Sequence, residues 1–160
     1  MIYSRSSEYA FRALTHLATQ PAGGYSMVKD IAKTEEIPTH FLAKILQQLA
    51  RKGLLRSSKG PSGGFALRRP ARELTLLDIV DALEGTASYQ QCAVGLAECS
   101  DQMPCPMHDS WKVLREGILD YLAGNTIGDL ATTLEAKKKS LARSRRPVSR
   151  SKAATRKRRA

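Results

Sequence analysis

The fold is decided by residues 29–67, which read KDIAKTEEIPTHFLAKILQQLARKGLLRSSKGPSGGFAL. Apolar side chains recur here at three- and four-residue spacing, which predicts a short helix near Ile31 and a longer one that starts near Pro38. Proline is tolerated at the first position of a helix, and Gly53 supplies the stop at the other end. Two short helices separated by about four residues are typical of a helix-turn-helix.

A β-hairpin is predicted directly after these helices. Residues 54–57 and 65–68 read as two short strands. The turn between them, SSKGPSGG, contains Gly60, Gly63 and Gly64, which permit positive φ values. A hairpin in this position would form the wing of a winged helix-turn-helix domain.

Three further amphipathic helices are predicted around this unit. The first covers 7–19, the second runs from a cap at Thr75 to Gly85, and the third covers 107–123. The third helix carries an apolar stripe that needs a partner surface. Its members are Trp111, Leu114, Ile118, Leu119 and Leu122. The predicted fold class is mainly α with a small β-wing: a winged helix-turn-helix domain followed by a long C-terminal dimerisation helix.

The composition divides the chain into four segments. We expect the DNA-binding domain in 1–85, a loop without helical period in 86–106, a dimerisation region that contains the long helix in 107–135, and a basic tail in 136–160. The tail has almost nothing to bury and is expected to be disordered. No run of about 18 apolar residues occurs, so we expect a soluble cytoplasmic protein without a membrane partner.

The net charge of +11 is distributed very unevenly. Residues 44–72 carry eight bases and no acids, whereas residues 73–135 carry two bases and eleven acids. Residues 136–160 add twelve bases and no acids. A local excess of bases on a helix-turn-helix and wing indicates nucleic-acid binding more specifically than the overall charge does. We expect the tail to act as a nonspecific DNA tether.

Seven residues are candidate DNA contacts. Polar residues near the start of the second helix of the pair would face base edges and phosphates in the major groove, and the wing would reach the adjacent backbone or minor groove. Basic side chains would neutralise phosphates, although a solvated basic face is the alternative. The candidates are Thr39, His40, Lys44, Arg51, Arg56, Lys59 and Ser62. The predicted partner is a double-stranded DNA operator.

The loop holds all three cysteines of the chain, in the pattern C-x6-C-x5-C-x2-H from Cys92 through Cys99 and Cys105 to His108. An odd number of closely spaced cysteines is unlike the pattern of a disulfide-bonded protein. It is typical of a metal site in a protein of a reducing compartment. Thiolates and imidazole bind either zinc or an iron–sulfur cluster. The spacing alone leaves zinc, a cluster and uncoordinated redox thiols open.

Five stretches together resemble a known family. They are SSEYAFRAL at 6–14, DIAKTEEIPTHFLAKILQQLARKGLL at 30–55, KGPSGGFAL at 59–67, LTLLDIVDALEG at 74–85 and the three-cysteine loop. This combination resembles the IscR/NsrR-type winged-helix transcriptional regulators, the Rrf2 family, over residues 1 to about 130. The resemblance implies a homodimer, joined through the helix at 107–123, whose iron–sulfur cluster alters its affinity for the operator.

The resemblance also implies roles for particular residues. Cys92, Cys99 and Cys105 would bind the cluster, and Thr39, His40 and Lys59 would lie at the DNA. His108 stands where IscR-like members place a histidine ligand, which favours a 2Fe-2S cluster over a 4Fe-4S cluster. Glu8 stands where other members recruit an N-terminal carboxylate from the partner subunit, so Glu8 is the alternative fourth ligand.

Two positions depart from the family pattern. The first cysteine gap is six residues where five is usual, and Ala43 occupies a position where IscR-like members have a glutamate. A carboxylate can accept a hydrogen bond from cytosine and alanine cannot, so the preferred operator sequence is expected to differ.

Three functions are compatible with these features. The first is a cluster-responsive repressor or activator that senses iron–sulfur status, redox poise, oxygen or nitric oxide, with any contact to RNA polymerase left open. The second is a winged-helix regulator with a structural zinc site that answers a partner protein or thiol oxidation. The third is a thiol redox enzyme or electron carrier. A C-x-x-C pair at a helix start is absent from the sequence, so we expect no enzyme.

Overall fold

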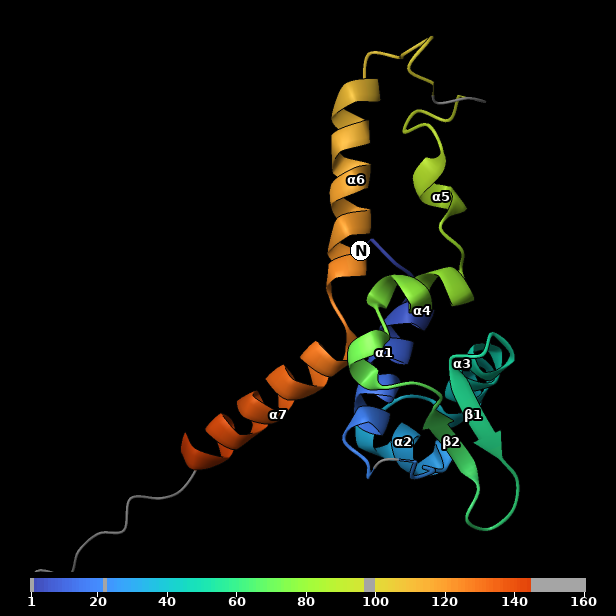
Figure 1. The fold of residues 1–160 in the computed structure, drawn as a ribbon, viewed down its shortest axis with the longest axis vertical. Helices are drawn as coiled ribbons and strands as arrows, with labels where there is room; N and C mark the ends of the chain where they lie inside the picture. The colour runs from blue at the N-terminus through green and yellow to red at the C-terminus, as the bar shows by residue number, and fades with distance from the viewer. Residues whose placement is uncertain (1, 22, 97–99, 145–160) are drawn as a thin grey trace, which may run out of the picture.

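The computed structural model describes residues 2–21, 23–96 and 100–144. Within these ranges the protein is mainly helical and has a single two-stranded antiparallel sheet (Figure 1). The predicted fold class is therefore confirmed. The elements in chain order are α1 (Arg5–Ala18), α2 (Val28–Glu35), α3 (Thr39–Arg51), β1 (Leu55–Ser58), β2 (Gly64–Leu67), the 3-10 helix η1 (Ala71–Glu73), α4 (Leu76–Leu83), α5 (Ala87–Gln90), α6 (His108–Gly124) and α7 (Ile127–Ser144).

The hydrophobic core lies where α1, α3 and α4 meet. Leu14 from α1, Leu46 from α3 and Ile79 from α4 are completely buried. Each such side chain contributes about 1.5–3 kcal/mol when it is transferred from water. The three- and four-residue apolar spacing of each helix directs one face into the core. The opposite face of α3 is therefore exposed to solvent and can contact a partner.

The hairpin is docked on the domain by backbone hydrogen bonds as well as by packing. Leu55 pairs with Leu67 and Ser58 pairs with Gly64, so the eight strand residues form a regular antiparallel ladder. On the other side of β2, Phe65 and Ser26 exchange two backbone hydrogen bonds of 2.9 and 3.0 Å. The wing is thus fixed to the segment that precedes α2.

The start of α4 is tied to the junction of the last two helices. Thr75 caps α4 in a reciprocal box with Asp78. The Leu76 N–H donates to the Asn125 carbonyl, and the Ile127 N–H donates to the Leu74 carbonyl, both at 2.9 Å. These bonds fix the point from which α6 and α7 diverge in Figure 1.

Two helices were not predicted from the sequence. Helix α5 is one short turn inside the segment that was read as a loop. Helix α7 continues to Ser144, so the prediction of disorder for 136–160 is wrong for residues 136–144. Thr126 and Asp129 cap α7 through reciprocal hydrogen bonds, and its Ala, Leu and Lys residues favour a helix without a strong apolar period. Residues 145–160 lie outside the described residues.

The described helices do not include a candidate membrane span. None of them combines the length and the apolar character that crossing a bilayer requires.

Gly64 offers a test of how the wing is docked. Its φ is +137°, and a Cβ atom added there would lie 2.1 Å from the backbone oxygen of Ser26. We predict that Gly64→Ala lowers the free energy of unfolding by about 1–3 kcal/mol, because it combines backbone strain with a clash against the chain that β2 must pair with. Urea unfolding followed by circular dichroism measures this loss.

Gly60→Ala is the matched control for this prediction. Gly60 also has a positive φ of +101°, yet nothing lies within 4 Å of its added Cβ atom. Its substitution should therefore cost less than that of Gly64. Equal losses for the two variants would show that the contact with Ser26 does not restrain the wing.

Candidate nucleic-acid interface and cysteine loop

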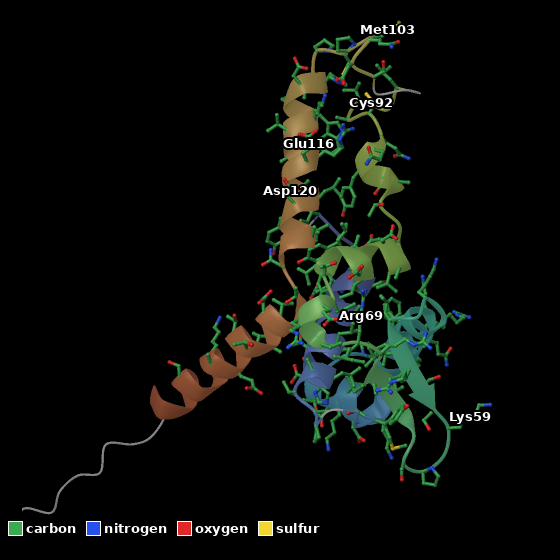
Figure 2. All side chains as sticks on the ribbon, viewed as in Figure 1. Lys59, Arg69, Cys92, Met103, Glu116 and Asp120 are labelled. Carbon is green, nitrogen blue, oxygen red and sulfur yellow. The ribbon has the colours of Figure 1, made fainter. Side chains whose placement is uncertain are left out.

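The seven candidate DNA contacts all lie on α3 or the wing, and all are exposed. On α3, His40, Lys44 and Arg51 follow one another at four- and seven-residue spacing, so they share the face of the helix opposite to the core. Lys59 stands at the turn of the hairpin and projects away from the body in Figure 2. The structure therefore places the candidate residues on two adjacent elements.

A hollow of about 490 Å³ separates α3 from the wing. Arg51 contributes to its wall from the helix, and Lys59 contributes from the hairpin. Among the described residues, none of the ion pairs involves Lys44, Arg51 or Lys59. The sequence has no acidic residue from 37 to 72, so the positive potential of this face is not neutralised locally.

A glutamine links α3 to α4. The side-chain amide of Gln48 donates to the backbone carbonyls of Ala82 and Leu83, at 3.2 and 3.1 Å. The last carbonyls of a helix have no partner within the helix, so a side-chain amide satisfies them well. Gln48 thus couples the position of the exposed basic helix to the C-terminal end of α4.

The same end of α4 also holds the N-terminal part of the chain. The carboxylate of Glu84 accepts hydrogen bonds from the Ser4 N–H and from the Ser7 hydroxyl, at the first turn of α1, where the helix dipole favours a negative charge. In α5, the Tyr89 hydroxyl donates to the Ile2 carbonyl. The end of α4 is therefore a junction that holds α1 and α3, and α5 is tied to the segment that precedes α1.

The cysteine loop begins at this junction and runs beside α6. Cys92 is buried, Cys105 is half-buried, and Cys99 lies outside the described residues. Hydrogen bonds from the backbone N–H groups of Val94 and Leu96 hold the pKa of the Cys92 thiol below its usual value, and a hydrogen bond with the Cys105 side chain adds to this effect. Cys92 and Cys105 therefore lie in contact, in a setting that favours the thiolate form of Cys92.

A tryptophan connects the loop to the long helix. The indole N–H of Trp111 donates to the Gln91 carbonyl at 2.9 Å. Figure 2 shows Cys92 beside the upper part of α6, at the opposite end of the view from Lys59. The cysteine loop and the wing therefore lie at opposite ends of the described part of the chain.

The candidate fourth ligands lie in different surroundings. His108 is only 4% exposed, and its Nε2 lies 2.8 Å from Oδ1 of Asp101. Glu8 lies in the first turn of α1 and is half-buried. Within the described part of the chain, no three side chains of the Cys, His, Asp and Glu types are gathered closely enough to hold a metal ion. The thiolate chemistry of the loop suits a metal, and the described residues assemble two of its cysteines.

Asp101 is held from two sides. The Lys112 ammonium lies 3.0 Å from both carboxylate oxygens of Asp101. The hydrogen bond with His108 and the charge of Lys112 keep the pKa of Asp101 below its usual range. His108 and Lys112 are one turn apart on α6, so the loop is clamped to the start of this helix.

Helix α6 carries a second apolar face in addition to the packed one. Leu122 on the packed face is completely buried, whereas Val113, Leu114 and Tyr121 are 72%, 56% and 51% exposed. Gly117 lies between them and has open space around it, which would let another backbone approach closely. We call Val113, Leu114, Gly117 and Tyr121 the exposed stripe of α6.

Two residues of this region were missed at the level of sequence. The role of Gln48 could not be predicted from the sequence, because the carbonyls it satisfies are 34 and 35 residues away. Asp101 stood in the cysteine loop without an assigned role. The signal that could have found it is chemical, because a histidine ligand usually has a carboxylate partner.

Comparisons with known proteins agree with this architecture. The Rrf2 family, described as an iron-dependent transcriptional regulator, matches residues 3–133. An HTH-type transcriptional regulator of Aquifex aeolicus is 36% identical over 132 residues, which cover 81% of this chain and 91% of the relative.

Two solved structures extend the likeness. CymR, the global cysteine regulator of B. subtilis, has a TM-score of 0.67 and 25% identity, covering 81% of this chain and 95% of its own. IscR from T. potens has a TM-score of 0.69 and 23% identity, covering 84% and 89%. The relatives and the fold together indicate a transcriptional regulator and not an enzyme.

Proposed function

This chain belongs to the Rrf2 family of transcriptional regulators, and from that membership we propose that it is a homodimeric cytoplasmic regulator whose affinity for its operator changes with an iron–sulfur cluster. The observation that carries the proposal is the junction at the end of α4. One side of this junction holds the basic helix α3 through Gln48, and the cysteine loop leaves from the other side.

The DNA-binding part of the proposal rests on α3 and the wing. His40, Lys44 and Arg51 would follow the major groove, and Lys59 with its neighbour Ser62 would meet the backbone or the minor groove next to it. Thr39 would act at the start of α3, and Arg56 on β1. Ala43 is half-buried and offers no hydrogen bond to a base, so this helix would read its site without a carboxylate at that position.

The cluster part of the proposal rests on the thiols. Cys92, Cys99 and Cys105 would hold the cluster, with His108 favoured over Glu8 as the fourth ligand and 2Fe-2S favoured over 4Fe-4S. The thiolate setting of Cys92 and the family description as iron-dependent support this assignment. When bound, the cluster would supply a one-electron redox couple.

Regulation requires that the cluster favours one of two conformations of the protein. A cluster that bound both conformations equally well would shift nothing, however tightly it bound. When the loop becomes ordered, the positions of α5 and of the end of α4 would change. The hydrogen bonds of Gln48 would transmit this displacement to α3. The Trp111 contact offers a second route, through α6 to the partner subunit.

The homodimer part of the proposal rests on the exposed stripe of α6. An apolar face of this kind on a helix that already buries its other face marks an interaction surface. A second copy of the chain is the occupant that fits best, because two such helices related by a twofold axis present the same face to each other. The small Gly117 would lie at the centre of the contact.

The first prediction from this proposal concerns the cysteines. Anaerobically prepared protein should be coloured and should contain iron and sulfide. Cys92→Ser, Cys99→Ser and Cys105→Ser should each remove most of the colour, because each deletes a thiolate ligand. Visible absorption and metal analysis measure the cluster content of each variant.

The control is Ser100→Ala, which should keep the cluster. Colourless wild-type protein that contains stoichiometric zinc would contradict the cluster and indicate the structural zinc site.

The second prediction concerns the basic face. Lys59→Ala and Arg51→Ala should each reduce the slope of log K against log salt concentration by about 0.9, because each removes one phosphate contact. Fluorescence anisotropy with duplex DNA at several salt concentrations gives the slope. Arg115→Ala on α6 is the control and should leave the slope unchanged. If the slope is the same for all four proteins, α3 and the wing do not lie on the DNA.

The third prediction concerns the exposed stripe. Leu114→Asp should weaken dimerisation by about tenfold or more, because it buries an unpaired charge in an apolar contact. Sedimentation velocity over a range of concentrations measures the change. Glu116→Gln, on the same helix but outside the stripe, should leave the dimer intact. A Leu114→Asp protein that dimerises like the wild type would exclude this helix as the interface.

A further inference from the structure

Two adjacent glutamines of α3 have opposite surroundings. Gln48 is half-buried, and its side-chain amide donates to two backbone carbonyls at the end of α4. Gln47 is exposed, and within the described part of the chain its side chain has no hydrogen-bond partner. One of the two amides therefore holds the fold together, and the other is available for a contact outside the chain.

Gln47 lies on the basic face of α3. It follows Lys44 by three residues and precedes Arg51 by four, so the three side chains lie on one side of the helix. Together with Arg51 it lines the hollow between α3 and the wing, to which Ser58 and Lys59 contribute from the hairpin. Any DNA bound by this face therefore comes close to Gln47.

The hydrogen-bonding capacity of Gln47 differs from that of its neighbours on this side of α3. Ala43, one turn before it, has no polar side-chain group, and Lys44 and Arg51 can only donate. Of the residues at 43, 44, 47 and 51, Gln47 is the one whose side chain can both donate and accept. A carboxamide of this kind can read a base that presents both an acceptor and a donor.

Adenine is the base that presents this pair of groups in the major groove. Its N7 accepts a hydrogen bond and its N6 amino group donates one, and a glutamine amide matches both at once. The cations on this face can neutralise phosphates, which adds affinity without sequence information. Because Gln47 is neutral, its chemistry suits sequence recognition better than charge neutralisation.

We propose that Gln47 is a specificity-determining residue of α3: its amide donates to N7 and accepts from the N6 amino group of one adenine in each half-site of the operator. This inference rests on the proposed function, because it needs α3 to lie in the major groove. It does not depend on the cysteine loop or on its ligand.

The test measures base preference in full-length, anaerobically prepared protein. A preferred duplex is selected from random sequence with the wild type, and each of its base pairs is then replaced by the other pairs at one fixed salt concentration. At one A·T pair of each half-site the wild type should lose about 5- to 150-fold in affinity, the range expected for a bidentate contact. Gln47→Ala should lose this discrimination at that pair and keep it at the others.

Two further readouts separate base reading from a phosphate contact. The slope of log K against log salt concentration should be unchanged in Gln47→Ala, because no charge is removed. Gln47→Glu should prefer cytosine at the position of the adenine, because a carboxylate accepts from the cytosine N4 amino group and cannot donate to N7.

The matched control is Gln90→Ala, which removes an exposed glutamine on α5. It should keep every base preference of the wild type. Because Gln47 is exposed and alanine favours a helix, circular dichroism should show an unchanged fold in Gln47→Ala.

The outcomes distinguish this inference from the proposed function. A wild type that selects a defined duplex, with the same preferences retained in Gln47→Ala, would overturn the inference and leave the operator-binding function standing. A loss of affinity that is equal for all duplexes in Gln47→Ala would also overturn it, because that result indicates a backbone contact. A wild type that shows no preference among duplexes would overturn the proposed function and this inference with it.

Discussion

The hydrogen bonds at the C-terminal end of α4 are the constraint on which the rest of the structure depends. A helix ends with carbonyl groups that lack internal partners, and here Gln48 of α3 satisfies two of them. Glu84, the next residue after α4, accepts hydrogen bonds from the start of α1. Because these bonds come from separate elements, α4 cannot move without a change in α1 or α3. The helix that carries the basic face and the loop that carries the thiols are therefore held by one short segment.

This arrangement connects two distant candidate sites, the basic face and the cysteine loop, within one small protein. The basic face and the cysteine loop lie at opposite ends of the described body (Figure 2). The first needs an exposed, rigid surface, and α3 has one because its other face is buried in the core. The second needs a loop that can bring thiolates together, and that loop is anchored by Trp111 and Asp101 rather than by a core of its own. The proposed regulation requires that a change in this loop acts on the well-packed domain.

The sequence predicted much of the fold, because local patterns decide local structure. The apolar period of α3 and the glycines of the wing were sufficient to place both elements. Helix α7 was missed because it depends on intrinsic propensity and a cap, and its apolar period is weak. The roles of Gln48 and Asp101 could not be predicted in the same way, since each depends on which carbonyl or ring the folded chain brings near. The candidate ligand residues were named from their chemistry and from a family resemblance, and their assembly around a cluster stays a prediction.

Under the proposed function, the state of the cysteine loop changes the affinity of α3 and the wing for DNA. The most direct measurement is the dissociation constant of one DNA duplex, selected from random sequence by the anaerobic protein, for the cluster-loaded and the cluster-free forms at the same salt concentration. The account predicts a difference of about 5- to 150-fold, the usual range for coupling between two sites. Equal dissociation constants for the two forms, with iron shown to be bound in one of them, would contradict it.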